Sequence, residues 1–512
     1  MAMAHDVSTL LMELESSQAG LIVSGFIYSY VIRYNDKARP VPDAAIEVPT
    51  IANGDLSKDG MTIKYRLRHN IRWQDGQTLT CDDLKFTWQV IMNPRNNVNA
   101  TDGFKDIKTV DCRDPYTAVV HMKRLYAPFL QTLWAPAGFA PILPRHILEK
   151  YNDDKGSLNS APFNAAPIGS GPFKLVEWDR NSLLKLAAFP QYFLGKPKLN
   201  EVLIKIIPDE NTVETQLRTH EIDFLSGGGL NSLRFTQLVR DPENGLKLET
   251  GDTDGFLHID FNLRRPVIND REVRLALACA TNRSLIVKNV EHNFGVPAET
   301  DQSPVLSWAY TSDVEHHPYD PEKARRILTS DGWEVGSDGI REKRGRRLEF
   351  VLTTINESVN FRTIETVLQR EWRDVGIQAD VKNVPATMLF ANDESSGILR
   401  SGNYDVAIFS WFALPDPDDN SIYTSSSIVP HGQNSLFWRN RKVDAAEHDA
   451  LSTIDARRRK ADYKVVQQQF AHDVPSIVLY YYRATYLYNS DLKGFSASPT
   501  GTTFWNPWNY SI

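Results

Sequence analysis

Hydrophobic and polar positions follow two different periods along this chain, and both occur within residues 64–88. Tyr65 and Leu67 alternate with charged residues, which is the period of a half-buried β-strand. An Asp-Gly turn follows. Thr80 then stands where a helix cap is expected, with Asp83 at the third helical position. The pattern therefore predicts a strand, a turn and a capped helix in this order.

The same two periods predict elements along most of the remaining chain. Strand patterns occur at 111–122 (a hairpin), 173–175, 202–206, 350–352, 376–381 and 404–411. Helical patterns occur at 21–32, from 211 onward, and at 269–280, 321–331 and 364–372. Because the two patterns alternate without an internal repeat, we expect an α/β fold class. A chain of 512 residues is too long for one compact core, so about two or three domains are expected.

Composition narrows the class of protein. Hydrophobic residues make up 41% and charged residues 24%, as in soluble globular proteins. The formal charge of −7 argues against a nucleic-acid partner, which requires a basic surface. Aromatic residues make up 10%, a stock that suits a pocket for a sizeable organic ligand. No apolar run reaches the roughly 18 residues that a membrane span needs.

Three cysteines occur, Cys81, Cys112 and Cys279, and no pair has the spacing of a metal site or a redox motif. A Cys81–Cys112 disulfide is one interpretation if the compartment is oxidising. Three buried thiols is the interpretation that we favour.

Motifs for catalysis are mostly absent. The segment Gly169–Pro172 lacks the Gly-Lys-Ser/Thr of a phosphate loop and is interpreted as a turn. His316, His317 and His431 have no partner in an H-E-x-x-H motif, so surface or hydrogen-bonded histidines are expected. The acidic cluster 416–420 leaves three interpretations open: calcium ligands, paired carboxylates for glycoside hydrolysis, or a solvated turn that caps a helix.

Several segments, taken in order, resemble the family 5 extracytoplasmic solute-binding proteins, the peptide- and nickel-binding subunits of ABC importers. The resemblance is carried by residues 64–88, 165–175, 220–223, 269–278 and the W-x-x-x-x-D-P-D loop 411–418. It implies a two-lobed α/β fold like that of periplasmic binding proteins (class II, with mixed sheets) and an extra inserted α+β subdomain. Residues 6–12 resemble a further family segment. The strand that precedes it in the family is missing here or reduced to a few residues.

The resemblance also implies a division of the chain, with crossovers near residues 256 and 478. Lobe I would comprise residues 1–35, 166–256 and 478–512, the inserted subdomain 36–165, and lobe II 257–477. The implied function is capture of an oligopeptide or similar organic solute by hinge closure, and delivery to an ABC permease in the membrane. A monomer without cofactor, metal or enzymatic activity is expected. A periplasmic or other extracytoplasmic location is implied, although residues 1–6 lack the basic and apolar parts of a secretory signal.

The resemblance suggests which residues contact the ligand. It places the loop 411–418 at the cleft between the lobes. The candidates are Trp411 and Phe412 as stacking surfaces, the carboxylates Asp416, Asp418 and Glu13, the flexible backbone at Gly228, and Tyr480 and Tyr482, of which at least one is expected to face the core.

One departure from the family bears on the ligand. Peptide-binding relatives often carry an aspartate just before the D-P-D, which pairs with the ligand's amino group. Residues 412–415 are uncharged here, although Asp416 is a possible substitute. A neutral, sugar-like or amphipathic ligand therefore becomes more plausible than a free peptide amine. Two other functions stay open, an acid-pair hydrolase that uses Asp416 and Asp418, and a sensor that presents its ligand to a receptor.

Overall fold

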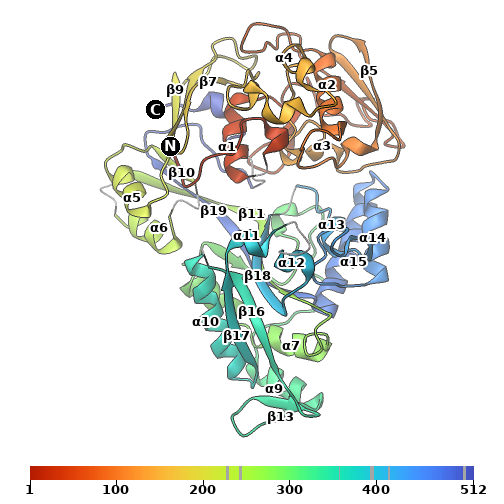
Figure 1. The fold of residues 1–512 in the computed structure, drawn as a ribbon, viewed down its shortest axis with the longest axis vertical. Coiled ribbons are helices and arrows are strands. Elements are labelled where there is room, and N and C mark those ends of the chain that lie inside the picture. Colours follow the sequence, from red (N-terminus) through yellow and green to blue (C-terminus); the bar gives the residue numbers. More distant parts are fainter. Residues whose placement is uncertain are drawn as a thin grey trace.

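Two α/β bodies lie one above the other, and two long strands join them (Figure 1). A computed structural model describes residues 1–15, 17–226, 230–241, 245–356, 358–391, 397–412, 415–499 and 503–512. We call the upper body in Figure 1, with both chain termini, the first body, and the lower one the second body. The mixed α/β architecture confirms the predicted fold class.

One mixed sheet runs through both bodies. In the described residues its order is β17-β16-β18-β11-β19-β10-β1-β9-β8-β7, and β12 also pairs with β19. The strands are β17 (Gln378–Val384), β16 (Glu349–Ile355), β18 (Val406–Phe412), β11 (Leu246–Phe261), β19 (Ser476–Asn489), β10 (Phe224–Ser226), β1 (Ala2–Met3), β9 (Glu201–Ile206), β8 (Leu183–Ala188), β7 (Phe173–Asp179) and β12 (Gly295–Pro297). The strand β1 is parallel to β9 and β10, whereas β11 is antiparallel to β18 and β19. The strand β1 has only two residues, as expected for the reduced first strand that the sequence predicts.

The strands β11 and β19 connect the two bodies. They pair from Leu246 with Asn489 to Asp260 with Ser476, and the register shifts between Asp252 and Phe256. One end of β19 pairs with β10 in the first body, and the last residues of β11, Gly255–Phe261, pair with β18 in the second. The irregular register therefore lies between the bodies. The division into 1–35, 166–256 and 478–512, 36–165, and 257–477 stays a prediction.

Helices of the second body pack on its sheet as their apolar faces predict. The helix α10 (Val359–Arg373) buries Ile364, Leu368 and Trp372, and α7 (Arg271–Cys279) and α9 (Pro321–Ser330) join the same core. Asp320 caps α9 by accepting a 2.7 Å hydrogen bond from the amide of Lys323, as predicted. Beside them lie α13 (Asn420–Tyr423), α14 (Arg441–Leu451) and α15 (Ala456–Asp473) (Figure 1).

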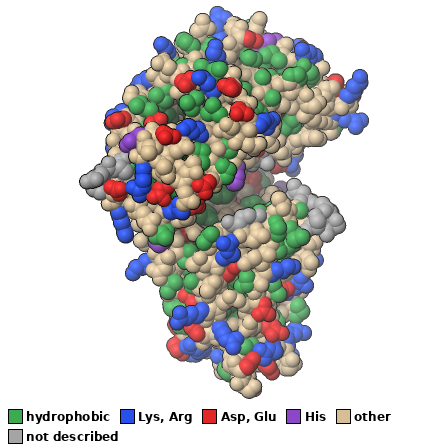
Figure 2. Space-filling model, turned by 60° about the vertical axis from the view of Figure 1, so that its left-hand side comes forward, with side chains coloured by type: hydrophobic (Ala, Val, Ile, Leu, Met, Phe, Trp, Pro, Cys, Tyr) green, Lys and Arg blue, Asp and Glu red, His purple; other side chains and the backbone are tan. Residues whose placement is uncertain are grey.

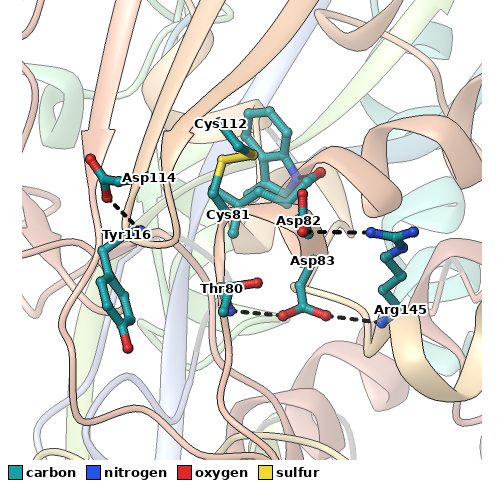
Figure 3. Close-up of a disulfide and its surroundings, with 10 residues drawn as sticks. Thr80, Cys81, Asp82, Asp83, Cys112, Asp114, Tyr116 and Arg145 are labelled. Carbon is teal, nitrogen blue, oxygen red and sulfur yellow. Dashed lines mark hydrogen bonds and ion pairs between the residues drawn. A yellow bond between two sulfur atoms is a disulfide. The ribbon is translucent and has the colours of Figure 1, made fainter.

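The inserted subdomain, the part of the first body around the β4-β6-β5 sheet, has its own apolar core. It contains β4 (Thr62–Arg66), β5 (Ile107–Asp114), β6 (Thr117–Met122) and α2 (Cys81–Met92). Asp83 accepts hydrogen bonds from the amides of Thr80 at 2.8 Å and of Arg145 at 3.0 Å (Figure 3). The capping box predicted from Thr80 and Asp83 is therefore present, and it also holds the start of α4 (Arg145–Leu148).

The favoured prediction of three thiols is wrong. Cys81 and Cys112 form a disulfide with a Cα–Cα distance of 5.7 Å (Figure 3). Cys81 is the first residue of α2 and Cys112 lies in β5, so the bond ties the helix to the sheet beneath it. Cys279 is a buried free thiol.

The predicted helix at 21–32 ends early, because α1 spans Gln18–Ile27. The amides that follow bond elsewhere: Tyr30 donates to the carboxylate of Asp43, and Val31 donates to the carbonyl of Trp134. The chain then enters β2 (Ile32–Tyr34), which pairs with β3 (Pro40–Pro42). An apolar run that is buried throughout does not reveal where a helix gives way to a strand.

The remaining elements are short or lie at the edges. They are α3 (Phe129–Thr132), α5 (Glu210–Arg218), α6 (Ser232–Val239), α8 (Arg283–Asn289), α11 (Ala386–Leu389), α12 (Ile398–Ser401), β13 (Glu334–Val335), β14 (Arg341–Lys343) and β15 (Arg346–Arg347), with the 3-10 turns η1 (Met12–Leu14) and η8 (Pro304–Leu306) among others. Within the described ranges, no helix has both the length and the apolar character that crossing a bilayer requires.

Candidate ligand cleft

The surface is hollowed between the two bodies (Figure 2). The strands β11 and β19 bound this cleft on one side. On the other side the inserted subdomain touches the second body, where the side chain of Gln131 accepts a 2.5 Å hydrogen bond from the amide of Asp416. Ile454 of the second body packs against the core of the inserted subdomain. The two bodies therefore meet at a hinge and at a contact opposite it.

A stacked aromatic pair of one exposed and one half-buried ring lies at the end of β18, against β19. The side chain of Phe412, the last residue of β18, is 72% exposed. Its ring stacks on Tyr482, with centroids 5.8 Å apart and planes 17° apart. The hydroxyl of Tyr482 is held by a 2.6 Å hydrogen bond with Ser410. Phe412 and Tyr482 thus form a fixed, solvent-facing platform of the kind that stacks on rings and apolar groups.

A glycine makes room for this platform. Gly255 in β11 is the register partner of Phe412. A Cβ atom at position 255 would lie 2.8 Å from Cδ1 of the Phe412 ring. The ring therefore crosses directly over the glycine on its way to Tyr482.

Tyr480 supports the platform from inside, whereas Trp411 lies on the other face of β18. Trp411 is half-buried and packs edge-on against Phe409, with centroids 6.0 Å apart, so neighbouring residues of β18 face opposite sides. Tyr480 is fully buried, contacts the ring edge of Tyr482, and donates a 2.8 Å hydrogen bond to Glu291. Tyr480 is the predicted tyrosine that faces the core.

The two predicted aspartates of the D-P-D loop have different surroundings. Arg459 donates two hydrogen bonds of 2.6 Å to the carboxylate oxygens of Asp416, and the hydroxyl of Tyr463 lies 3.2 Å away. Asp416 is thus already paired with an arginine inside the protein. Burial, followed by the charge of Asp416, raises the pKa of Asp418 to about 6.

Glu13 is not part of this arrangement. Glu13 lies in η1 with its side chain 3% exposed, and neither carboxylate oxygen has a hydrogen-bond partner among the described residues. Burial raises the pKa of Glu13 well above its ordinary value, which favours the neutral form of the carboxyl. It is expected to be a packing group of the first body, beside Tyr28. Gly228 lies outside the described residues.

Comparison of the sequence with known protein families identifies the family to which this chain belongs. The profile of the "Bacterial extracellular solute-binding proteins, family 5 Middle" matches residues 41–430, most of the chain. The chain belongs to this family. The resemblance found from the sequence is therefore confirmed.

Individual relatives agree over almost the full length. The family 5 chain is 28% identical over 488 residues to the oligopeptide-binding protein AppA of Bacillus subtilis, which covers 94% of this chain and 86% of AppA. It is 28% identical over 460 residues to the glutathione-binding protein GsiB of Escherichia coli, covering 88% of this chain and 83% of GsiB. The structure of NikZ from Campylobacter jejuni, in complex with Ni(L-His), is 27% identical and covers 100% of this chain and 98% of NikZ, with a TM-score of 0.83.

Sequence reasoning missed the partners that hold the cleft of this family 5 protein. Gln131 and Asp416 are 285 residues apart, and no local pattern connects them. Arg459 and Tyr463 are four residues apart on α15, so their shared helix face was visible. Their pairing with Asp416 could not be predicted from the sequence, because Asp416 lies outside that helix.

The described residues contain no group of three or more His, Cys, Asp or Glu side chains arranged to hold a metal ion. Within this acidic loop, Asp416 is paired with Arg459. The predicted absence of a metal or cofactor stays a prediction.

Proposed function

We propose that this protein captures an organic solute between its two bodies by closing about β11 and β19. The captured solute would then pass to an ABC permease in the membrane. The observation that supports this proposal is the Phe412–Tyr482 platform, a stacked aromatic pair with one exposed ring, in a protein of the solute-binding family. A ligand favours the closed arrangement only through the extra contacts it makes there, and the platform supplies such contacts.

The ligand would be an oligopeptide or a similar organic solute with a ring or apolar group. AppA is named for oligopeptides and GsiB for glutathione, which supports a peptide-like cargo. The bidentate pair with Arg459 neutralises Asp416, so this carboxylate is not a free partner for a ligand's ammonium group. Binding would therefore depend on stacking and neutral hydrogen bonds more than on a buried ion pair. A neutral, sugar-like solute fits the same chemistry.

We propose that the protein does not turn its ligand over. The competing acid-pair hydrolase needs Asp416 as a nucleophile or base, and Arg459 and Tyr463 hold both of its carboxylate oxygens. The raised pKa of Asp418 suits a general acid and so supports that alternative. The hydrolase mechanism also requires a second, available carboxylate, and Asp416 does not supply one. A sensor that presents ligand to a receptor would use the same cleft. A monomer in the periplasm or another extracytoplasmic compartment is the proposed working state.

Mass spectrometry of small molecules that co-purify with the native protein tests the cargo class. Calorimetry with the compound found and analysis of the compound after incubation complete the experiment. We expect saturable binding, recovery of the intact compound, and a smaller radius of gyration in X-ray scattering. Loss of the compound with time would favour the hydrolase, and an unchanged radius of gyration would contradict hinge closure.

A further inference from the structure

A second cavity lies between the inserted subdomain and the second body. It has a volume of about 620 Å³, within the usual range for small-molecule sites. Neither Phe412 nor Tyr482 lines it. We call it the interbody pocket. Of the residues that the sequence predicts to contact ligand, only Asp416 is among those that line this pocket. The predicted ligand site therefore does not explain the pocket.

The walls of the interbody pocket come from two different bodies. Tyr34, Ile51 and Leu130 belong to the first body, whereas Leu306 and Trp308 belong to the second body. Ile51 is 47% exposed, so much of its apolar side chain is available to a molecule in the pocket. The apolar lining would cover the hydrophobic part of a small ligand.

The rim of this pocket carries more positive than negative charge. Arg459 and Asp416 neutralise one another through two hydrogen bonds of 2.6 Å. Lys37 and Arg39 line the same pocket, are exposed, and form no ion pair with any described residue. They give the rim a local excess of positive charge on a protein whose formal charge is −7. A local positive rim on an acidic protein attracts organic anions and repels organic cations.

The indole of Trp308 links the pocket to the contact between the bodies. The guanidinium of Arg459 lies 5.1 Å from its ring centroid, and its Nε1 donates a 3.5 Å hydrogen bond to the carbonyl of Pro415. Pro415 is next to Asp416, whose amide bonds to Gln131. A molecule in the pocket would therefore touch both sides of the contact that closes the cleft.

We propose that the interbody pocket is a second binding site, specific for a small amphipathic organic anion such as an aromatic or branched carboxylate. Its carboxylate pairs with Lys37 and Arg39, and its apolar part lies between Ile51 and Trp308. Because both walls are needed, the anion binds the closed arrangement better than the open one and stabilises closure. This last step rests on the proposed function, whereas the site itself does not.

Naphthoate is a suitable probe, with naphthalenemethanol as its uncharged analogue. Calorimetry on the full chain without cargo should show that naphthoate binds and that the alcohol binds more weakly. The double variant Lys37→Ala/Arg39→Ala should weaken naphthoate binding by about tenfold or more, because it removes both cations. Trp308→Ala on the opposite wall should also weaken it. X-ray scattering should show a smaller radius of gyration when naphthoate is present.

The matched control is Lys196→Ala/Lys198→Ala, which removes two exposed cations with the same spacing at a site remote from the pocket lining. It should leave naphthoate affinity within about twofold of the original value. Equal effects of the two double variants would overturn the proposal, as would equal binding of the alcohol. If Phe412→Ala removed naphthoate binding, the anion would occupy the cleft and the second site would not exist. A failure of the proposed function gives a different result: the cargo is consumed during incubation, whereas naphthoate still binds.

Discussion

Phe412 differs from its neighbours because its ring has a partner on one face only. Tyr482 covers one face, and the side chain is 72% exposed on the remainder. Phe412→Ala should therefore weaken cargo binding by about tenfold, which corresponds to about 1.4 kcal/mol of lost stacking and apolar contact. Calorimetry with the co-purified ligand measures this change.

Two further variants define what the Phe412 result means. Phe412→Tyr keeps the ring and should keep most of the affinity. Tyr319→Ala removes another exposed aromatic side chain, which is 46% exposed and lies in the segment before α9, and should leave affinity unchanged. Equal affinities for Phe412→Ala and the original protein would remove the platform from the binding site.

Gly255 offers a test that leaves both aromatic rings in place. In Gly255→Ala the new methyl group would lie 2.8 Å from Cδ1 of Phe412, so the ring must rotate away from Tyr482. We expect affinity to fall by about threefold to tenfold. The melting temperature should change little, because the atom that moves is the outer part of an exposed side chain. A large loss of stability with normal affinity would show that the ring does not move.

Alternation along a strand explains why sequence reasoning could not rank the aromatic candidates. Adjacent residues of β18 face opposite sides, and both Trp411 and Phe412 are aromatic, so the pattern alone did not show which one faces the cleft. Trp411 packs inward against Phe409, and its ligand role stays a prediction. Trp411→Ala is expected to affect stability first, because it leaves a gap beside a packed ring.

At the scale of elements, local signals were sufficient wherever a cap or a one-sided apolar stripe was present. Both α2 and α9 begin where Thr80 and Asp320 predict. The end of α1 was not predicted because residues 28–31 are as apolar and buried as the helix before them. The disulfide was not predicted because it depends on how α2 packs against β5, which is a tertiary relation.

The Cys81–Cys112 disulfide should contribute measurably to the stability of the inserted subdomain. It joins residues 31 apart, and the loop-entropy relation gives about 3 to 4 kcal/mol for a loop of that length. Reductant should therefore lower the melting temperature of the original protein. The variant Cys81→Ser/Cys112→Ser should melt at that lower temperature with or without reductant. If reductant has the same effect on both proteins, Cys279 or another process is responsible.

At the scale of the whole molecule, buried carboxyl groups in the second body make stability depend on pH. Asp301, Asp419 and Glu447 are 0%, 6% and 0% exposed, and burial raises the pKa of each. Burial also raises the pKa of Asp418 to about 6 and that of Glu365 in α10 to about 7. The folded protein thus keeps protons that the unfolded chain releases above about pH 4 to 4.5.

The sign of the pH effect follows from this difference in proton binding. Because the folded-state pKa values are raised, the stabilising contribution is fully present at low pH and is lost as the pH rises through about 6 to 7. The free energy of unfolding should therefore fall between about pH 5 and about pH 8. Glu365 alone would account for at most about 3 kcal/mol of this decrease. Denaturant titrations at a series of pH values measure it.

Glu365→Gln isolates one group, because glutamine has nearly the same shape and does not titrate. If Glu365 stays protonated in the folded protein, the variant should be more stable than the original at about pH 8 and similar at about pH 5, so its pH slope is shallower. Glu334→Gln in the exposed strand β13 is the matched control and should keep the original slope. Identical slopes for all three proteins would show that Glu365 ionises in the folded state as it does in the unfolded chain.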